Sequence, residues 1–261
     1  MDYRDIQYSV ENGLAIVTLN RPQARNALTG QMRAELVHAI KRAGLAARCV
    51  VLTGAGSAFC SGQDLKDASS ADTDRPLDLE RTLREEYVPM LEAIYDCPVP
   101  TIAAVNGPAA GAGANLALCA DVVIAAESAY FMQAFSRIGL MPDAGGTWIL
   151  PRKIGLAKAM GAALFAEKLS ARSAEEMGLI WEVAEDAAFE TTWRARATYL
   201  AEGPTKAFSA IKTSLRQSLD NSLSKQLSLE AHKQGELGRS RDFMEGVTAF
   251  IEKRPAKFEG R

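Results

Sequence analysis

Histidine is scarce in this sequence, with only His38 and His232 among 261 residues. Histidine has the ordinary pKa nearest neutrality and is therefore a frequent general acid or base. His38 falls on the polar side of a helical pattern over residues 31–43, together with Glu35. The polar segment around His232 contains no Ser or Asp pattern of a catalytic triad. If the chain is an enzyme, we expect a carboxylate to be its base.

Cysteine lacks any organised spacing. The four cysteines lie at long, irregular intervals without a CxxC pair or a neighbouring His, at Cys49, Cys60, Cys97 and Cys119. This pattern argues against a zinc site and against the disulfide framework of a small secreted protein. The N-terminus is also too charged for a signal peptide. We therefore expect free thiols, no metal and a cytoplasmic location.

An excess of charge of one sign is absent as well. Lys and Arg number 30 against 32 Asp and Glu, which gives a formal net charge of -2, and the basic residues form no stripe. Nucleic acids and anionic membranes need a basic field, so we expect neither as a partner. The apolar stretch at residues 108–126 is interrupted by Asn115 and Asp121. It predicts a buried helix followed by a buried strand rather than a membrane span.

The sequence does contain a regular alternation of strand and helix patterns. Residues 6–10 and 14–19 flank an Asn12-Gly13 turn and predict a β-hairpin. The patterns that follow are a helix over 31–43, a buried strand over 49–53, a charged amphipathic segment over 79–95, and buried strands over 101–105 and 121–125. From about residue 187 the sequence is helical. We expect an α/β layered core with its site at the strand ends, followed by a helical layer or oligomerisation element.

Two glycine-containing turns are candidates for binding an anion. Neither the turn at 54–65 nor that at 107–113 has the dinucleotide fingerprint or the Gly-Lys-Ser/Thr of a P-loop. Cys60 resembles a nucleophile elbow only faintly and is better explained as a small buried residue. Free backbone N–H groups at the two turns could instead converge on one carbonyl oxygen. Taken alone, the glycines are better explained by tight packing.

Asp143 is a candidate proton carrier. It lies among apolar and small residues just before an apolar helix that contains Trp148. It could be no more than a helix N-cap. In an apolar pocket, however, desolvation would raise its pKa toward the value that a proton shuttle needs at neutral pH. The spacing alone leaves both interpretations open.

Four ordered motifs resemble those of the crotonase (enoyl-CoA hydratase/isomerase) superfamily. They are residues 20–28 (NRPQARNAL), 52–65 (LTGAGSAFCSGQDL), 104–113 (AVNGPAAGAG) and 139–147 (GLMPDAGGT). Their order and spacing cover nearly the whole chain, which makes the set far more specific than any one glycine turn. The resemblance implies a spiral core of ββα turns over residues 1–200. It also implies a helical region over 201–261 that builds trimers, usually paired as a dimer of trimers.

The resemblance also implies the substrate and the residues that hold it. The substrate would be an acyl-CoA thioester, so that coenzyme A enters with it and no separate cofactor is needed. The N–H groups of Gln63 and Ala112 match the two donors to the thioester oxygen, and Arg25 matches the position along the CoA adenine and phosphates. The other matching positions for CoA or the acyl group are Ala27, Ala58, Gly62, Asp64, Leu65, Lys66, Gly113 and Phe135. Residues that could reach a neighbouring subunit's CoA are Phe250, Lys253 and Phe258.

The departures from the family pattern favour one reaction. Hydratases of the family use two glutamates, and the matching positions here are Asn115 and Phe135, which cannot exchange protons at neutral pH. Asp143 stands where several isomerases carry an Asp. One carboxylate suits an isomerase that removes a proton at one carbon and returns it at another. Phe135 and Trp148 would suit a ring-shaped acyl group, although core packing explains them equally well.

Other activities stay open at this point. A broad enoyl-CoA hydratase, or a thioesterase or dehalogenase that uses Asp143, would share the same motifs. The chain could also be a family member that binds acyl-CoA or RNA without catalysis, although its charge opposes RNA. Turnover of a bound acyl-CoA separates the enzymes from the binding proteins.

Overall fold

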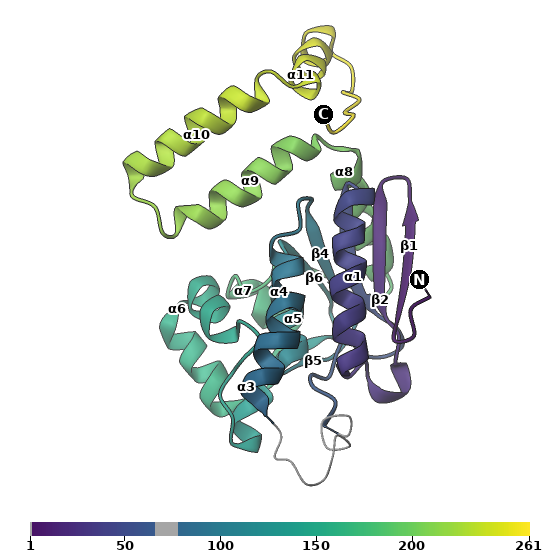
Figure 1. Ribbon diagram of the computed structural model, residues 1–261, viewed down its shortest axis with the longest axis vertical. Coiled ribbons are helices and arrows are strands. Elements are labelled where there is room, and N and C mark those ends of the chain that lie inside the picture. Colours follow the sequence, from purple (N-terminus) through teal and green to yellow (C-terminus); the bar gives the residue numbers. More distant parts are fainter. Residues whose placement is uncertain (1, 66–77) are drawn as a thin grey trace.

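The chain opens with the expected β-hairpin. In the computed structural model, which describes residues 2–65 and 78–261, β1 (Ile6–Glu11) and β2 (Leu14–Leu19) pair antiparallel (Figure 1). Asn12 and Gly13 join them with φ of 50° and 77°. Asn and Gly are the residues that tolerate positive φ best, which is why this pair makes a tight two-residue turn.

Four further strands extend the hairpin into a six-stranded sheet. β3 (Cys49–Gly54), β4 (Thr101–Val105), β6 (Val122–Ala126) and β9 (Glu182–Ala184) add in parallel, and the sheet order is β1-β2-β3-β4-β6-β9. The first four residues of β3 and all of β4 are buried. Such continuous burial is typical of parallel strands covered on both faces, as the sequence predicts. In Figure 1, α1 (Gly30–Ala46) crosses in front of the strands and α8 (Phe189–Glu202) lies behind them.

A smaller second sheet and several helices complete the core. The sheet joins β5 (Ala109–Ala110), β7 (Tyr130–Met132) and β8 (Leu169–Ser170). The other core helices are α3 (Leu79–Thr82), α4 (Val88–Tyr95), α5 (Ala112–Leu118), α6 (Gly146–Phe165) and α7 (Ala171–Glu176). A π-helical turn at Leu83–Tyr87 joins α3 to α4, and short 3-10 turns occur at Pro22–Ala24 and Ala134–Ile138. The four cysteines are free and buried, as expected.

One expectation about α1 is wrong. His38 is exposed, but Glu35 is only 6% exposed rather than on the solvent side of the helix. Its carboxylate accepts hydrogen bonds from the backbone N–H groups of Arg4 (2.7 Å) and Asp5 (2.9 Å). The segment before β1 therefore covers this part of α1 and satisfies a buried charge.

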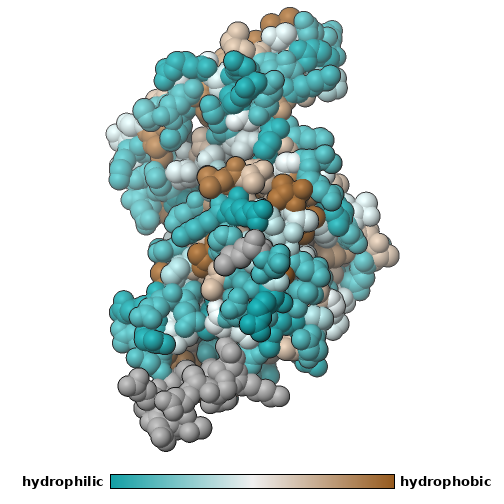
Figure 2. Space-filling model, turned by 45° about the vertical axis from the view of Figure 1, so that its right-hand side comes forward, coloured by the Kyte–Doolittle hydropathy of each residue, from teal (hydrophilic) through white to brown (hydrophobic). Residues whose placement is uncertain are grey.

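Three C-terminal helices project from the core (Figure 1): α9 (Thr205–Ser218), α10 (Leu223–Leu237) and α11 (Arg241–Glu252). No residue of α9 or α10 is buried, and the exposed apolar side chains on these helices and just after α9 include Ile211, Leu215, Leu219, Leu223 and Leu227. Figure 2 shows apolar patches on an otherwise mostly hydrophilic surface. The division predicted at residue 200 stays a prediction. Within the described ranges, no helix has both the length and the apolar character needed to cross a bilayer.

Candidate active site

The two glycine turns lie side by side. The N–H groups of Phe59 and Cys60 donate to the Pro108 carbonyl (3.1 and 3.2 Å), and Ala110 N–H donates to the Cys60 carbonyl (2.9 Å). Cys60 and Ala109 also form an isolated parallel bridge. Segments that are about fifty residues apart in the sequence are therefore joined at their backbones, as the oxyanion hypothesis requires.

Two glycines make this close approach possible. A Cβ on Gly113 would come within 2.4 Å of the Cys60 carbonyl oxygen. A Cβ on Gly62, whose φ is +97°, would lie 3.0 Å from the Ala110 carbonyl oxygen and 3.6 Å from the Ala112 nitrogen. The packing explanation and the oxyanion explanation are thus compatible, because tight packing is what brings the turns together.

The backbone amides of Gln63 and Ala112 find no acceptor within the described part of the chain. Leu28 N–H donates to the Gly62 carbonyl (2.8 Å), and the Leu28 carbonyl accepts from Asp64 N–H (3.1 Å). In this parallel pairing the intervening Gln63 N–H points away from Leu28. Ala112 is the first residue of α5, where an N–H has no intrahelical partner. Among the hydrogen bonds of residues 2–65 and 78–261, neither N–H donates. Two such donors can stabilise the negative oxygen of an enolate.

Asp143 presents a half-buried carboxyl group with one unpaired oxygen. Burial raises its pKa from 3.8 to about 6, against the hydrogen bond from its own backbone N–H. Oδ1 is buried and has no hydrogen-bond partner within the described part of the chain. The N-cap of α6 is Gly145, and no side chain caps that helix. The N-cap interpretation of Asp143 is therefore wrong, and the carboxyl group has the properties of a proton shuttle.

The backbone of Asp143 is fixed by two donors. Its carbonyl accepts from Gly146 N–H (2.8 Å) and from Asn115 Nδ2 (2.7 Å). Asn115 is fully buried in α5, and its Oδ1 accepts from Gln133 Nε2 (2.8 Å). This chain of amides was not anticipated from the sequence. The signal for it was a lone Asn in an otherwise apolar helix.

Tyr87 is a second group that the sequence did not indicate. It ends the π-helical turn, is 1% exposed, and lies under the Arg33 guanidinium at 4.7 Å from the ring centroid. Arg33 Nη1 also donates to its hydroxyl (3.3 Å) and Arg33 pairs with Glu86 (2.6 Å). Burial raises the pKa of Tyr87; Arg33 opposes the rise and the nearby Asp143 carboxylate adds to it. Tyr87 therefore stays neutral near the candidate base.

The positions that match the hydratase glutamates contribute no ionisable group. Asn115 is an amide, and the phenyl ring of Phe135 is 7% exposed. The Phe135 ring tip lies 3.8 Å from where a Cβ on Gly111 would stand, next to the turn that carries Ala112. Phe135 thus packs at the turn that carries Ala112, where its ring could also form one wall of the space for an acyl group.

The predicted CoA positions gather around the first turn. Arg25 is exposed and its carbonyl accepts from Ser61 N–H (3.0 Å), beside Gly62. Asp64 pairs with Arg21 (2.8 Å), which ties the motif at 20–28 to that at 52–65. Of the rest, Ala27, Ala58, Gly62 and Gly113 are buried and Leu65 is 58% exposed. Lys66 lies outside the described residues. These CoA assignments stay predictions.

The C-terminal positions are remote from this site within one chain. Figure 1 places α11 at the top of the molecule, well away from α5 and β5 in its lower half. Phe250 on α11 is 86% exposed, Lys253 follows the helix, and Phe258 packs near Gly246. A contact of these side chains with CoA would have to involve another subunit, and it stays a prediction.

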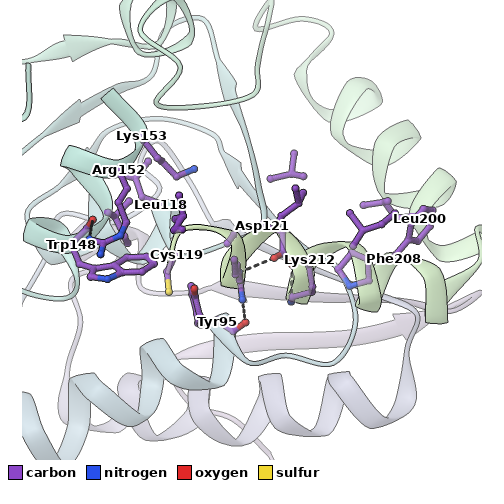
Figure 3. A pocket seen from close by; sticks show the side chains of 18 residues that line it. Tyr95, Leu118, Cys119, Asp121, Trp148, Arg152, Lys153, Leu200, Phe208 and Lys212 are labelled. Carbon is purple, nitrogen blue, oxygen red and sulfur yellow. Dashed lines mark hydrogen bonds and ion pairs between the residues drawn. The ribbon is translucent and has the colours of Figure 1, made fainter. Parts of the chain in front are cut away.

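A cavity of about 410 Å³ lies elsewhere, between the core and α9 (Figure 3). Asp121 pairs there with Lys212 (2.8 Å) and Arg216 (2.7 Å), and Trp148 meets Tyr95 edge-on at 5.8 Å. No residue of the oxyanion turns lines this cavity, and Asp143 does not. Trp148, which is 40% exposed, therefore lines this cavity rather than packing in the core.

The fold and the described part of the site together define a class of enzyme: an α/β core in which two backbone amides without a protein acceptor accompany one half-buried carboxyl group. The chain belongs to the enoyl-CoA hydratase/isomerase family, whose model matches residues 9–261. It is thus an enzyme of that family, which confirms the resemblance seen in the four motifs.

Two relatives bear on its activity. The chain is 61% identical over 261 residues, with full coverage of both chains, to a Rhodobacter capsulatus protein named a probable enoyl-CoA hydratase. It is 45% identical over 254 residues, covering 97% of each chain, to the 1,2-epoxyphenylacetyl-CoA isomerase of Escherichia coli. One relative is thus named a hydratase and the other an isomerase, which are the two activities in the family name.

A solved structure confirms the fold. An enoyl-CoA hydratase/isomerase family protein from Mycobacterium abscessus superposes with a TM-score of 0.94 at 41% identity, covering 98% of this chain and 100% of that one. The predicted fold class, a crotonase-type α/β spiral with a helical C-terminal region, is therefore confirmed.

Proposed function

We propose that the protein is an acyl-CoA isomerase that works through a thioester enolate. The Gln63 and Ala112 amides hold the thioester oxygen, and Asp143 carries the proton. The observation that carries this proposal is the half-buried Asp143 carboxyl group, whose Oδ1 has no hydrogen-bond partner among the described residues, while Asn115 and Phe135 cannot transfer protons.

The proposed reaction balances with one carboxylate. Asp143 accepts the proton from the carbon next to the thioester carbonyl as that C–H bond breaks. The electron pair delocalises onto the thioester oxygen, where the two amides stabilise the negative charge. The carboxyl group then returns the proton at the far end of the conjugated system, and the double bond shifts. A pKa of about 6 leaves the group ionised at neutral pH yet able to hold a proton.

A finer assignment is a ring substrate, namely 2-(1,2-epoxy-1,2-dihydrophenyl)acetyl-CoA, whose ring epoxide would be converted to an oxepin-CoA in phenylacetate catabolism. Support comes from the 45% identical relative named 1,2-epoxyphenylacetyl-CoA isomerase. The Phe135 ring beside the oxyanion turn is a suitable surface for an unsaturated ring.

The alternative is enoyl-CoA hydration, which the name of the 61% identical relative favours. Hydration needs a group to activate water in addition to a group for the carbon proton. The described part of the site offers one carboxyl group, that of Asp143, so we place hydration second. Thioester hydrolysis, dehalogenation and acyl-CoA binding without turnover are weaker alternatives, since no relative described above carries such a name.

An assay of the unmodified protein separates these functions. Isomerisation of a 3-enoyl-CoA and conversion of the ring epoxide, with slow hydration of crotonyl-CoA, would support the proposal. Brisk hydration without isomerisation would establish the alternative. Acyl-CoA binding without turnover would identify a non-catalytic member.

We also propose self-association as a trimer or a dimer of trimers. The support is the row of exposed apolar side chains on α9 and α10 and the open cavity between α9 and the core. Exposed apolar surface of this extent on projecting helices suits an interface between subunits.

A further inference from the structure

The turn that carries Asp143 has a demanding backbone conformation. The two residues after Asp143 both have left-handed φ, 49° at Ala144 and 80° at Gly145. Ala has a Cβ and adopts this region only when its surroundings enforce it. Something outside the turn must therefore hold it.

The Asn115 side chain supplies that restraint. Its Nδ2 donates to the Asp143 carbonyl at 2.7 Å, and Gln133 fixes the orientation of the amide by donating to Oδ1 at 2.8 Å. A Cβ on Gly146 would lie 2.4 Å from Asn115 Nδ2, so the glycine leaves room for this contact. The exposed fractions of Asn115 and Gln133 are 0% and 4%, so water competes with neither bond.

Asn115 also belongs to the element that carries an oxyanion donor. Ala112 and Asn115 lie three residues apart on α5. One rigid helix therefore presents the Ala112 backbone N–H to the thioester oxygen and the Asn115 side-chain amide to the turn that carries Asp143. We propose that Asn115 is a positioning residue, which sets the place of the Asp143 carboxyl group relative to the oxyanion donors. This inference rests on the proposed isomerase function. It assigns a purpose to a position where a hydratase would carry a catalytic glutamate.

Among the described residues, Tyr87 is the ionisable side chain whose pKa the Asp143 carboxylate affects. Arg33 and Cys60 act in turn on Tyr87, and Glu86 is paired to Arg33. Burial raises the pKa of Tyr87, and burial raises that of Cys60 to about 12. Asp143 is therefore the group whose ionisation is expected near pH 6, and its pKa reports how well the turn shields it.

The test compares Asn115→Ala and Gln133→Met with Thr53→Val. The first variant removes the donor and the second removes the group that orients it. Thr53→Val removes a different side-chain bond to a backbone carbonyl (Thr53 Oγ1 to Ala104, 2.8 Å) away from the turn. We expect Asn115→Ala to lower kcat by about 10- to 100-fold with little change in KM, because a small displacement of a catalytic group is costly. Gln133→Met should act in the same direction but less strongly, and Thr53→Val should leave kcat unchanged.

A second readout does not need activity. Carboxyl ¹³C NMR measures the pKa of Asp143, and Asp143→Asn assigns its signal. In Asn115→Ala this pKa should fall from about 6 toward its ordinary value, because the relaxed turn admits water. It should stay in place in Thr53→Val. An Asp143 pKa that does not move in Asn115→Ala or Gln133→Met would overturn the inference. Absence of isomerase activity in the unmodified protein would overturn the proposed function instead, and the NMR comparison would still decide the role of Asn115.

Discussion

Gly62 faces the backbone nitrogen of Ala112, which lies 3.6 Å from where a Cβ on Gly62 would stand. This relationship joins the two turns that the sequence separates by about fifty residues. It places the Ala112 amide at the start of α5 next to the residue that precedes Gln63, so the two candidate oxyanion donors lie in the same small region.

We expect Gly62→Ala to lower isomerase activity by about 10²–10³-fold, the loss typical of one oxyanion donor. The new methyl group would lie 3.0 Å from the Ala110 carbonyl oxygen, and the φ of +97° is unfavourable for Ala. The protein should also lose roughly 1–3 kcal/mol of unfolding free energy. Gly161→Ala is the matched control, because no heavy atom lies within 4 Å of its Cβ position and its φ is not left-handed. Equal activity of both variants would contradict the role of the turn.

The raised pKa of Asp143 predicts a pH-dependent cost to stability. Its carboxyl group binds a proton more tightly in the folded protein, with a pKa of about 6, than in the unfolded chain near 3.8. Its stabilising contribution is complete below pH 3.8 and is lost as pH rises through 6. Asp143→Asn should therefore be more stable than the unmodified protein at pH 7.5, by the order of 1 kcal/mol given partial solvent screening, and no more stable at pH 3.5.

Urea unfolding at the two pH values measures this difference. Asp220→Asn, an exposed carboxylate after α9, controls for the change in net charge. A stability gain for Asp143→Asn that is the same at both pH values would mean that desolvation does not act on this carboxyl group.

Much of the core could be predicted because its signals are local. The β1–β2 hairpin follows from alternation and the Asn12-Gly13 turn, and β3 from an unbroken apolar run. The free thiols follow from the cysteine spacing. Asp143 was identified as a candidate because its neighbours in the sequence are apolar or small.

Features that depend on distant partners could not be predicted. A helical pattern places Glu35 among polar residues, but it cannot show that the N–H groups of Arg4 and Asp5 bind there. Asn115 is visible as a polar residue in an apolar helix, whereas its bond to the Asp143 carbonyl depends on how α5 meets the turn before α6. The place of Trp148 in the cavity by α9 likewise depends on tertiary packing.

Arg25 provides a test of the predicted CoA position. Because its side chain is exposed beside the first turn, Arg25→Ala should weaken CoA binding by about 3- to 10-fold at low salt and by less at high salt, where phosphate attraction is screened. Lys41→Ala, an exposed cation on α1, is the control. Isothermal titration with free CoA measures both, and a salt-independent or absent effect at Arg25 would remove it from the site.

The projecting helices provide a test of self-association. We expect the unmodified protein to have a mass that is a multiple of three of the 28.1 kDa chain by sedimentation equilibrium. Leu223→Asp together with Leu227→Asp should shift it toward single chains, because a buried charge is costly at an interface. Ser224→Asp on the exposed polar side of α10 is the control. A single-chain mass for the unmodified protein would contradict the proposed assembly.

The central claim is that Asp143 alone carries the proton. Its most direct test is the kcat of Asp143→Asn for isomerisation of a 3-enoyl-CoA, measured beside the unmodified protein across pH 5–8. We predict a fall of about 10²–10⁴-fold in the variant, as for loss of a general base. In the unmodified protein, activity should rise with pH through about 6. Unchanged isomerisation in Asp143→Asn would contradict the account.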